Sequence, residues 1–85
     1  MAVKMIVAKI NNQPKIVFGD RHYSDDYHSD IAERMGIPKS AVLGGGIADV
    51  ASRRIYGTSY GFGPYNPTLV RGLLPDWTVE RPSNY

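Results

Sequence analysis

The sequence predicts one small α/β (α+β) domain, residues 1–85, with a mixed β-sheet of about five to six strands flanked by two helices. The length of 85 residues is that of a single domain, and 42% hydrophobic with 21% charged residues is typical of an ordinary globular protein. Short β-rich runs separated by turn residues indicate strands, and two segments carry helix-start and helix-stop signals. The order strand, strand, helix, strand, strand, helix, strand favours two helices packed on a mixed sheet.

The first segments predict a β-hairpin. Residues 3–10 alternate loosely and are rich in β-branched side chains, which favours a strand. The following NNQP, residues 11–14, is a turn signal, and KIVF, residues 15–18, is expected to form the second strand.

A helix is predicted next. Residues 24–26, Ser-Asp-Asp, are typical of a helix N-terminus, and Gly36 followed by Pro38 ends the helix. Asp30 and Arg34 are expected to form an i,i+4 ion pair on the exposed face. The spacing of four predicts a buried stripe of Tyr27, Ile31 and Met35.

The second half predicts three strands and one helix. AVLGGG, residues 41–46, reads as a short strand running into a glycine run, and IADV with RIYGTSY reads as a tight hairpin turned around Ala51 and Ser52. Asn66 before Pro67 is a helix start, and Pro75 ends that helix. Residues 76–80 form the expected last strand, with Trp77 and Val79 packed against a helix.

Composition restricts the function. No cysteine is present, which excludes disulfides, thiolate chemistry and sulfur-ligated zinc and suits a reducing compartment. The longest apolar run, MIVA, is too short to span a membrane, and Lys4 and Lys9 interrupt any signal sequence, so we expect a cytoplasmic protein with no membrane partner. A net charge of +2 and a pI near 9.0 leave room for an anionic partner.

Two features are candidates for chemistry. YGTSYGFGP, residues 56–64, has three glycines within seven residues, which permits positive φ and an approach of backbone N–H groups to an anion. It has neither the GK[ST] ending of a P-loop nor a GxGxxG pattern, so nucleotide binding is not indicated, and a plain turn is the alternative. His28 is either a functional residue or a structural helix residue that is solvated or hydrogen-bonded.

Two other kinds of site were weighed. His22 and His28 lie near several aspartates, but their spacing fits neither HExxH nor an EF-hand, so no metal and no other cofactor is expected. Basic residues near aromatic residues are the combination that single-stranded nucleic-acid binders use, but no RNP-like motif accompanies them. These residues are Arg53, Arg54, Tyr56, Tyr60 and Phe62.

Four motifs in order produce a family resemblance. DYHSDI, LGGG, IYGTSYGFGP and LPDWTVE resemble the motifs of the protein phosphohistidine phosphatase family, also called the Janus (Ocnus) family, and the resemblance covers residues from about 1 to 80. Its members carry a YHADI-type helix motif, a triple glycine after a strand, a YGYSxAYGP-type loop and a PDYEV-type final strand. The chain is similar to a shortened member of that family.

The resemblance implies a metal-free phosphatase that hydrolyses the P–N bond of phosphohistidine in proteins. His28 matches the catalytic histidine, as general base or as nucleophile. The implied phosphate-binding residues are Lys4, Arg21, Ser29, Ser59, Tyr60 and Gly61, with Ser29 acting through its backbone amide. The expected partner is a phosphohistidine-containing protein or another small phosphorylated substrate.

The chain also departs from the family pattern. The segment before His28 is longer and more acidic, and only Arg21 matches an arginine that the family has there. Ile47 replaces an arginine that commonly follows the triple glycine, and the following hairpin and the second helix are shorter. Two alternatives therefore stay open, a basic single-stranded nucleic-acid-binding module and a catalytically idle phosphate- or protein-interaction domain of the same fold. The sequence leaves the oligomeric state undetermined.

Overall fold

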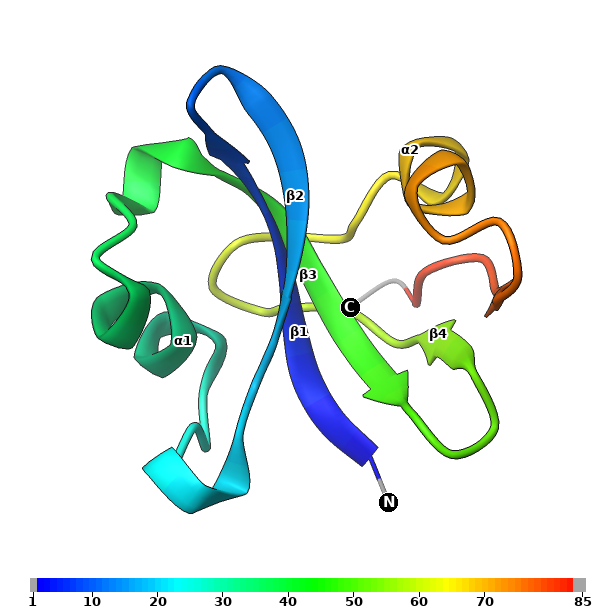
Figure 1. Ribbon diagram of the computed structural model, residues 1–85, viewed down its shortest axis with the longest axis horizontal. Helices are drawn as coiled ribbons and strands as arrows, with labels where there is room; N and C mark the ends of the chain where they lie inside the picture. The colour runs from blue at the N-terminus through cyan, green and yellow to red at the C-terminus, as the bar shows by residue number, and fades with distance from the viewer. Residues whose placement is uncertain (1, 84–85) are drawn as a thin grey trace.

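The computed structural model describes residues 2–83, which form a five-stranded mixed sheet with two α-helices (Figure 1), as predicted. The strands are β1 (Ala2–Ile10), β2 (Gln13–Phe18), β3 (Val42–Asp49), β4 (Arg54–Tyr56) and β5 (Thr78–Val79). The helices are α1 (His28–Met35) and α2 (Pro67–Leu73), and two single 3-10 turns are η1 (Arg21–Tyr23) and η2 (Lys39–Ala41).

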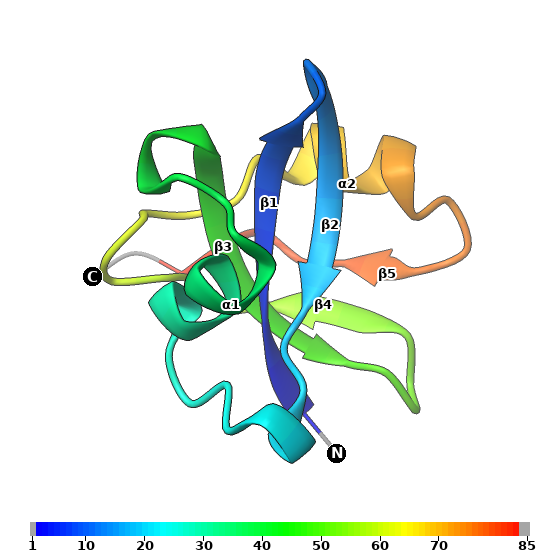
Figure 2. The same cartoon turned by 60° about the vertical axis from the view of Figure 1, so that its left-hand side comes forward.

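The strands are ordered β2-β1-β3-β4-β5 in the sheet. Neighbouring strands are antiparallel, except that β4 and β5 are parallel. Figure 2 shows how the sheet curls, with β5 lying beside β4. The long strands β1 and β3 form the centre of the domain and carry the residues that position the site.

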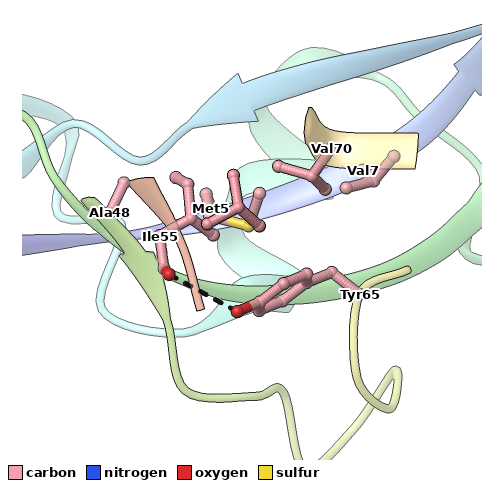
Figure 3. Close-up of a cluster of buried hydrophobic side chains, with 7 residues drawn as sticks. Met5, Val7, Ala48, Ile55, Tyr65 and Val70 are labelled. Carbon is pink, nitrogen blue, oxygen red and sulfur yellow. Dashed lines mark hydrogen bonds between the residues drawn. The ribbon is translucent and has the colours of Figure 1, made fainter. Parts of the chain in front are cut away.

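Alternate residues of β1 face different helices, which lie on opposite sides of the sheet (Figure 1). Met5 and Val7 pack with Val70 of α2, in the cluster of buried side chains that Figure 3 shows. Ile6 and Ala8 pack instead against α1. Since side chains alternate along a strand, Lys4 points to the α1 side of the sheet, where His28 lies.

The first hairpin is tighter than predicted. Asn11 and Asn12 have φ values of 51° and 65°, so the turn uses only these two residues, as in a type I′ hairpin. β2 therefore begins at Gln13 and includes Pro14. Proline is tolerated there because β2 is an edge strand, where one missing N–H breaks no ladder between two neighbours.

The triple glycine does not end a strand, contrary to the prediction. Gly44, Gly45 and Gly46 lie inside β3, which continues to Asp49 and forms the predicted hairpin with β4. Each glycine is covered by another segment. A Cβ on Gly44 would lie 2.3 Å from the Pro64 carbonyl oxygen, and one on Gly46 would lie 2.8 Å from the ring of Tyr65. The glycines are therefore required by close packing of the loop after β4 on the strand.

The predicted start of the first helix was wrong. α1 begins at His28, and Asp30 Oδ2 accepts a hydrogen bond from the Tyr27 backbone N–H at 2.9 Å. The predicted Asp30–Arg34 pair was also wrong. Arg34 instead binds the buried Asp25 carboxylate at 2.7 Å, and its hydrogen bonds hold the pKa of Asp25 below the usual value. A long-range pair thus replaces the helical one and ties the preceding loop to α1.

The predicted core stripe of α1 was correct at one position of three. Ile31 is fully buried, whereas Tyr27 and Met35 are 69% and 48% exposed. The helix begins only at His28, so Tyr27 precedes its first turn, and the buried neighbour of Ile31 is Ala32. The predicted end of the helix is correct, since Gly36 has a φ of 67°.

The C-terminal elements largely follow the prediction. Asn66 Oδ1 accepts a hydrogen bond from the Leu69 N–H, and Pro67 is the first residue of α2. The last strand is only two residues long, not five, although Val79 is buried with Val70 as expected. Trp77 precedes the strand and stacks on the ring of Phe18, with the ring centroids 5.5 Å apart.

Replacing Ile31 with alanine is expected to lower the free energy of unfolding by about 2 to 5 kcal/mol, because the fully buried side chain leaves a cavity between α1 and β1. Urea unfolding followed by circular dichroism measures the change. Tyr27→Ala on the same segment is the control and should change stability little, because that side chain is exposed. Equal losses in the two variants would contradict the buried face of α1 described here.

Candidate functional site

A cavity of about 400 Å³ lies on the α1 side of the sheet, between α1, the β1–β3 ladder and the loop after β4. The sheet contributes Lys4 and Ile47, and the start of α1 contributes Tyr27, His28 and Ser29. The loop contributes the consecutive residues 58–62, and η2 contributes Lys39. Segments far apart in the sequence therefore meet at one site.

The cavity brings together the candidate site residues with one exception. His28, Lys4, Ser29, Ser59, Tyr60 and Gly61 all line it. Arg21 lies in an adjoining cavity of about 450 Å³, which shares Lys4 and Ile47 with the first. The Arg21 guanidinium donates a hydrogen bond to the Ala2 carbonyl oxygen at 3.1 Å, which holds it at this second cavity.

His28 is half-buried against β3. Its Nε2 lies 2.8 Å from the Gly46 carbonyl oxygen, and because a carbonyl only accepts, Nε2 carries the proton in that bond. A Cβ on Gly45 would lie 2.8 Å from His28 Cδ2, so the Cδ2–Nε2 edge of the ring rests on the strand. In the neutral ring the lone pair is then on Nδ1, at the opposite edge. The strand backbone thus selects the tautomer.

The surroundings of His28 favour the neutral imidazole. Burial lowers its pKa below the usual 6.5, and the positive charge of Lys4 lowers the pKa further, while the Gly46 carbonyl opposes both. Burial lowers the pKa of His28 by more than the hydrogen bond to the Gly46 carbonyl raises it. At neutral pH the Nδ1 lone pair is therefore available to take a proton or to attack an electrophile.

The glycine loop is held in place by its own hydrogen bonds. Gly57 and Gly63 have φ values of 76° and 83°, so they make the bends that the sequence predicted. Ser59 is fully buried and its Oγ accepts a hydrogen bond from the Phe62 N–H at 3.2 Å. Gly61 lies at the exposed tip, where an added Cβ would meet no atom within 4 Å. The tip of the loop is thus open to a ligand.

The charges around the cavity suit an anion. Lys4, Lys39 and the imidazole of His28 line it, and among the residues that the structure describes no acidic residue does. Within residues 2–83, neither lysine takes part in an ion pair. An anion that enters therefore meets two available ammonium groups and no carboxylate.

Several lining residues had not been predicted. Lys39 carried no motif, Thr58 and Phe62 lay in the predicted glycine loop but had not been named as phosphate-binding residues, and Tyr27 had been predicted to lie in the core. The Thr58 hydroxyl is, in the part of the chain that the structure describes, a buried side-chain oxygen with no hydrogen-bond partner. For Lys39 no local signal exists, because its place at the cavity depends on the packing of η2 beside β1.

Of the residues named for the two rival sites, His28, Tyr60 and Phe62 line the cavity, whereas the Arg54–Tyr56 pair and His22 are in contact with other groups. The Arg54 guanidinium pairs with Glu80 and lies 4.2 Å above the Tyr56 ring, so this aromatic face is covered. His22 packs edge-on against Tyr23 in η1, outside the cavity. Among residues 2–83 no group of three or more histidine, aspartate or glutamate side chains could hold a metal ion. No helix in that part of the chain has the length and apolar character needed to cross a membrane.

Comparison of the chain with protein-family models, with curated proteins and with solved structures finds no match.

Proposed function

We propose that the chain is a metal-independent phosphatase that hydrolyses the P–N bond of phosphohistidine in proteins. The observation that carries the proposal is the neutral, half-buried His28 imidazole in a cavity lined by two lysines and no acidic residue. The four sequence motifs support it, because the residues that they imply, apart from Arg21, line this one cavity. The absence of cysteine supports a cytoplasmic location as part of the proposal.

The site contains the groups that phosphoryl transfer requires. Lys4 and backbone N–H groups of Ser29 and the loop residues 59–61 are the donors proposed for the phosphoryl oxygens, where negative charge is concentrated. Catalysis by these groups is chiefly a matter of position and charge. The loop tip is open, so its backbone can approach the phosphoryl group closely.

His28 has two possible roles in the reaction. As a general base, Nδ1 removes a proton from water while the water oxygen attacks phosphorus, the P–N bond breaks, and the departing imidazole nitrogen takes up a proton. As a nucleophile, Nδ1 itself forms a bond to phosphorus while the P–N bond of the substrate breaks and the departing imidazole nitrogen takes up a proton. Water then hydrolyses the new P–N bond and releases inorganic phosphate and His28. Both roles need the lone pair on Nδ1, which is present because the hydrogen bond to the Gly46 carbonyl oxygen keeps the proton on Nε2.

The first test is release of inorganic phosphate from a histidine-phosphorylated protein, with and without a chelator. Release that resists the chelator is the expected result. Phosphate binding without release would support the idle interaction domain instead. Binding of single-stranded nucleic acid that falls steeply with salt, and that a change at His28 leaves unaltered, would support the nucleic-acid module.

Replacing Gly61 with valine is expected to weaken phosphate binding at least tenfold while leaving the fold intact. The added side chain meets open space at the loop tip, where the phosphoryl group is proposed to lie, and Gly61 is not among the glycines with positive φ. Phosphate titration followed by NMR, with far-UV circular dichroism on the same sample, separates the two effects. Loss of the dichroism signal would show that the loop tip is structural.

A further inference from the structure

Two lysines approach the cavity from different elements. Lys4 lies on β1 opposite Ile47 of β3, whereas Lys39 lies in η2, shortly before Val42, which pairs with Ala8 of β1. Lys4 and Ala8 are four residues apart on one strand, which corresponds to about 13 Å at the rise of a β-strand. The two lysines therefore reach the cavity from different positions along the sheet.

The two lysines also differ in their relation to His28. The charge of Lys4 lowers the pKa of His28, and Lys39 is not among the groups that shift this pKa. Lys4 is therefore the cation whose charge acts on the His28 ring, and it also borders the adjoining cavity. A phosphoryl group bound between His28 and Lys4 does not need Lys39, which belongs to a different element.

The space between the two lysines is suited to a ring. Tyr27, Ile47 and Phe62 line the cavity together with His28, and no carboxylate is present there. A volume of about 400 Å³ is within the range of small-molecule sites and exceeds what a phosphoryl group fills. A substrate bound through its phosphoryl group at Lys4 can thus place its imidazole along the apolar wall and extend toward Lys39.

We propose that Lys39 binds a second anion of the substrate, a carboxylate on the leaving-group side of the P–N bond. This rests on the proposed function, since it extends the same site. Lys39 is then a specificity-determining residue, and substrates with a carboxylate near the phosphohistidine ring are preferred to those without one. The carboxylate belongs either to an acidic side chain beside the phosphohistidine or to the amino acid itself.

Two pairs of substrates test this. The first pair is two phosphohistidine peptides with blocked ends that differ only in Glu or Gln beside the phosphohistidine. The second pair is free phosphohistidine and phosphohistamine, which differ only in the carboxylate. The native chain should have a kcat/KM about two- to fivefold higher for the carboxylate-bearing member of at least one pair, as expected for an exposed ion pair. Preference in the first pair assigns Lys39 to a side chain, and preference in the second assigns it to the amino acid.

The Lys39→Met variant should remove that preference, because it should lower kcat/KM more for the carboxylate-bearing member than for the neutral member of the pair. Lys15→Met is the control, because Lys15 is exposed on β2 and does not line the cavity, and it should retain the preference. Hydrolysis without preference, or a preference that persists in Lys39→Met, would contradict the proposed role of Lys39 but not the proposed phosphatase activity. No hydrolysis of any of the four substrates would overturn the phosphatase and this inference with it.

Discussion

Replacing His28 with glutamine is expected to lower kcat/KM for phosphate release from a phosphohistidine protein by about 10²- to 10⁴-fold, the usual contribution of a positioned proton acceptor. Glutamine can still donate an amide N–H toward the Gly46 carbonyl, which accepts from Nε2 at 2.8 Å in the native chain, but it lacks the Nδ1 lone pair. The variant should therefore fold normally and keep its affinity for inorganic phosphate.

His22→Gln is the matched control, because His22 is exposed in η1 and does not line the cavity. Its turnover should equal that of the native chain. Thermal unfolding of both variants shows whether a lost activity reflects a lost fold. Native-like turnover in His28→Gln would mean that His28 is a structural residue, which binds the Gly46 carbonyl oxygen of β3 and takes no part in the reaction.

The pH dependence follows from the lowered pKa of His28. The reaction needs the neutral ring, so kcat/KM should fall at acidic pH with a midpoint below pH 6.5. The titration of the His28 ring protons followed by NMR should have the same midpoint. Because the unfolded chain binds this proton more readily, stability should be complete above pH 6.5 and should fall as the pH drops through the folded-state pKa. A measured pKa of His28 above 6.5 would mean that burial is not the main influence on this pKa.

The second large effect is expected at the triple glycine. An alanine at Gly44 would place its methyl group 2.3 Å from the Pro64 carbonyl oxygen, on a backbone with a φ of 154° that side chains rarely adopt. The atoms nearest to the added methyl group belong to the backbone of Pro64 and Tyr65, so they cannot move away by a change of side-chain rotamer. We expect a loss of at least about 3 kcal/mol in the free energy of unfolding, which for a domain of this size lowers the melting temperature by more than about 12 °C.

Gly72→Ala is the control for Gly44→Ala. Gly72 lies in α2, where an added Cβ meets no atom within 4 Å, so alanine should stabilise the helix by about 0.5 to 1 kcal/mol. The same substitution thus has opposite signs at two glycines of one chain. A Gly44→Ala variant as stable as the native chain would show that the loop after β4 does not lie on β3.

The contrast between these two glycines shows why only part of the fold was predictable. Turn and cap signals act between residues a few positions apart, and such signals correctly placed the N-cap at Asn66 and the end of α1 at Gly36. They also placed the first turn within residues 11–14, of which the structure uses Asn11 and Asn12. LGGG carried no such local information, because its glycines are required by Pro64, His28 and Tyr65, all distant in the sequence. The glycine run was therefore wrongly predicted to end its strand.

The candidate site divides in the same way. The motifs identified His28, Lys4 and the loop residues 59–61 as candidates, and the structure places them around one cavity. Lys39 was missed because nothing near it in the sequence distinguishes it from an ordinary exposed lysine.

The sequence by itself determined the α+β class, the order of the elements and the types of residue at the candidate site, because periodicity, capping and composition depend on neighbouring residues. Only the tertiary structure decided that Arg34 pairs with Asp25, that the Gly46 carbonyl selects the tautomer of His28, and that lysines from two different elements line one cavity. These contacts join residues that only the register of β1 with β3 and the packing of α1 bring together, so no local pattern encodes them.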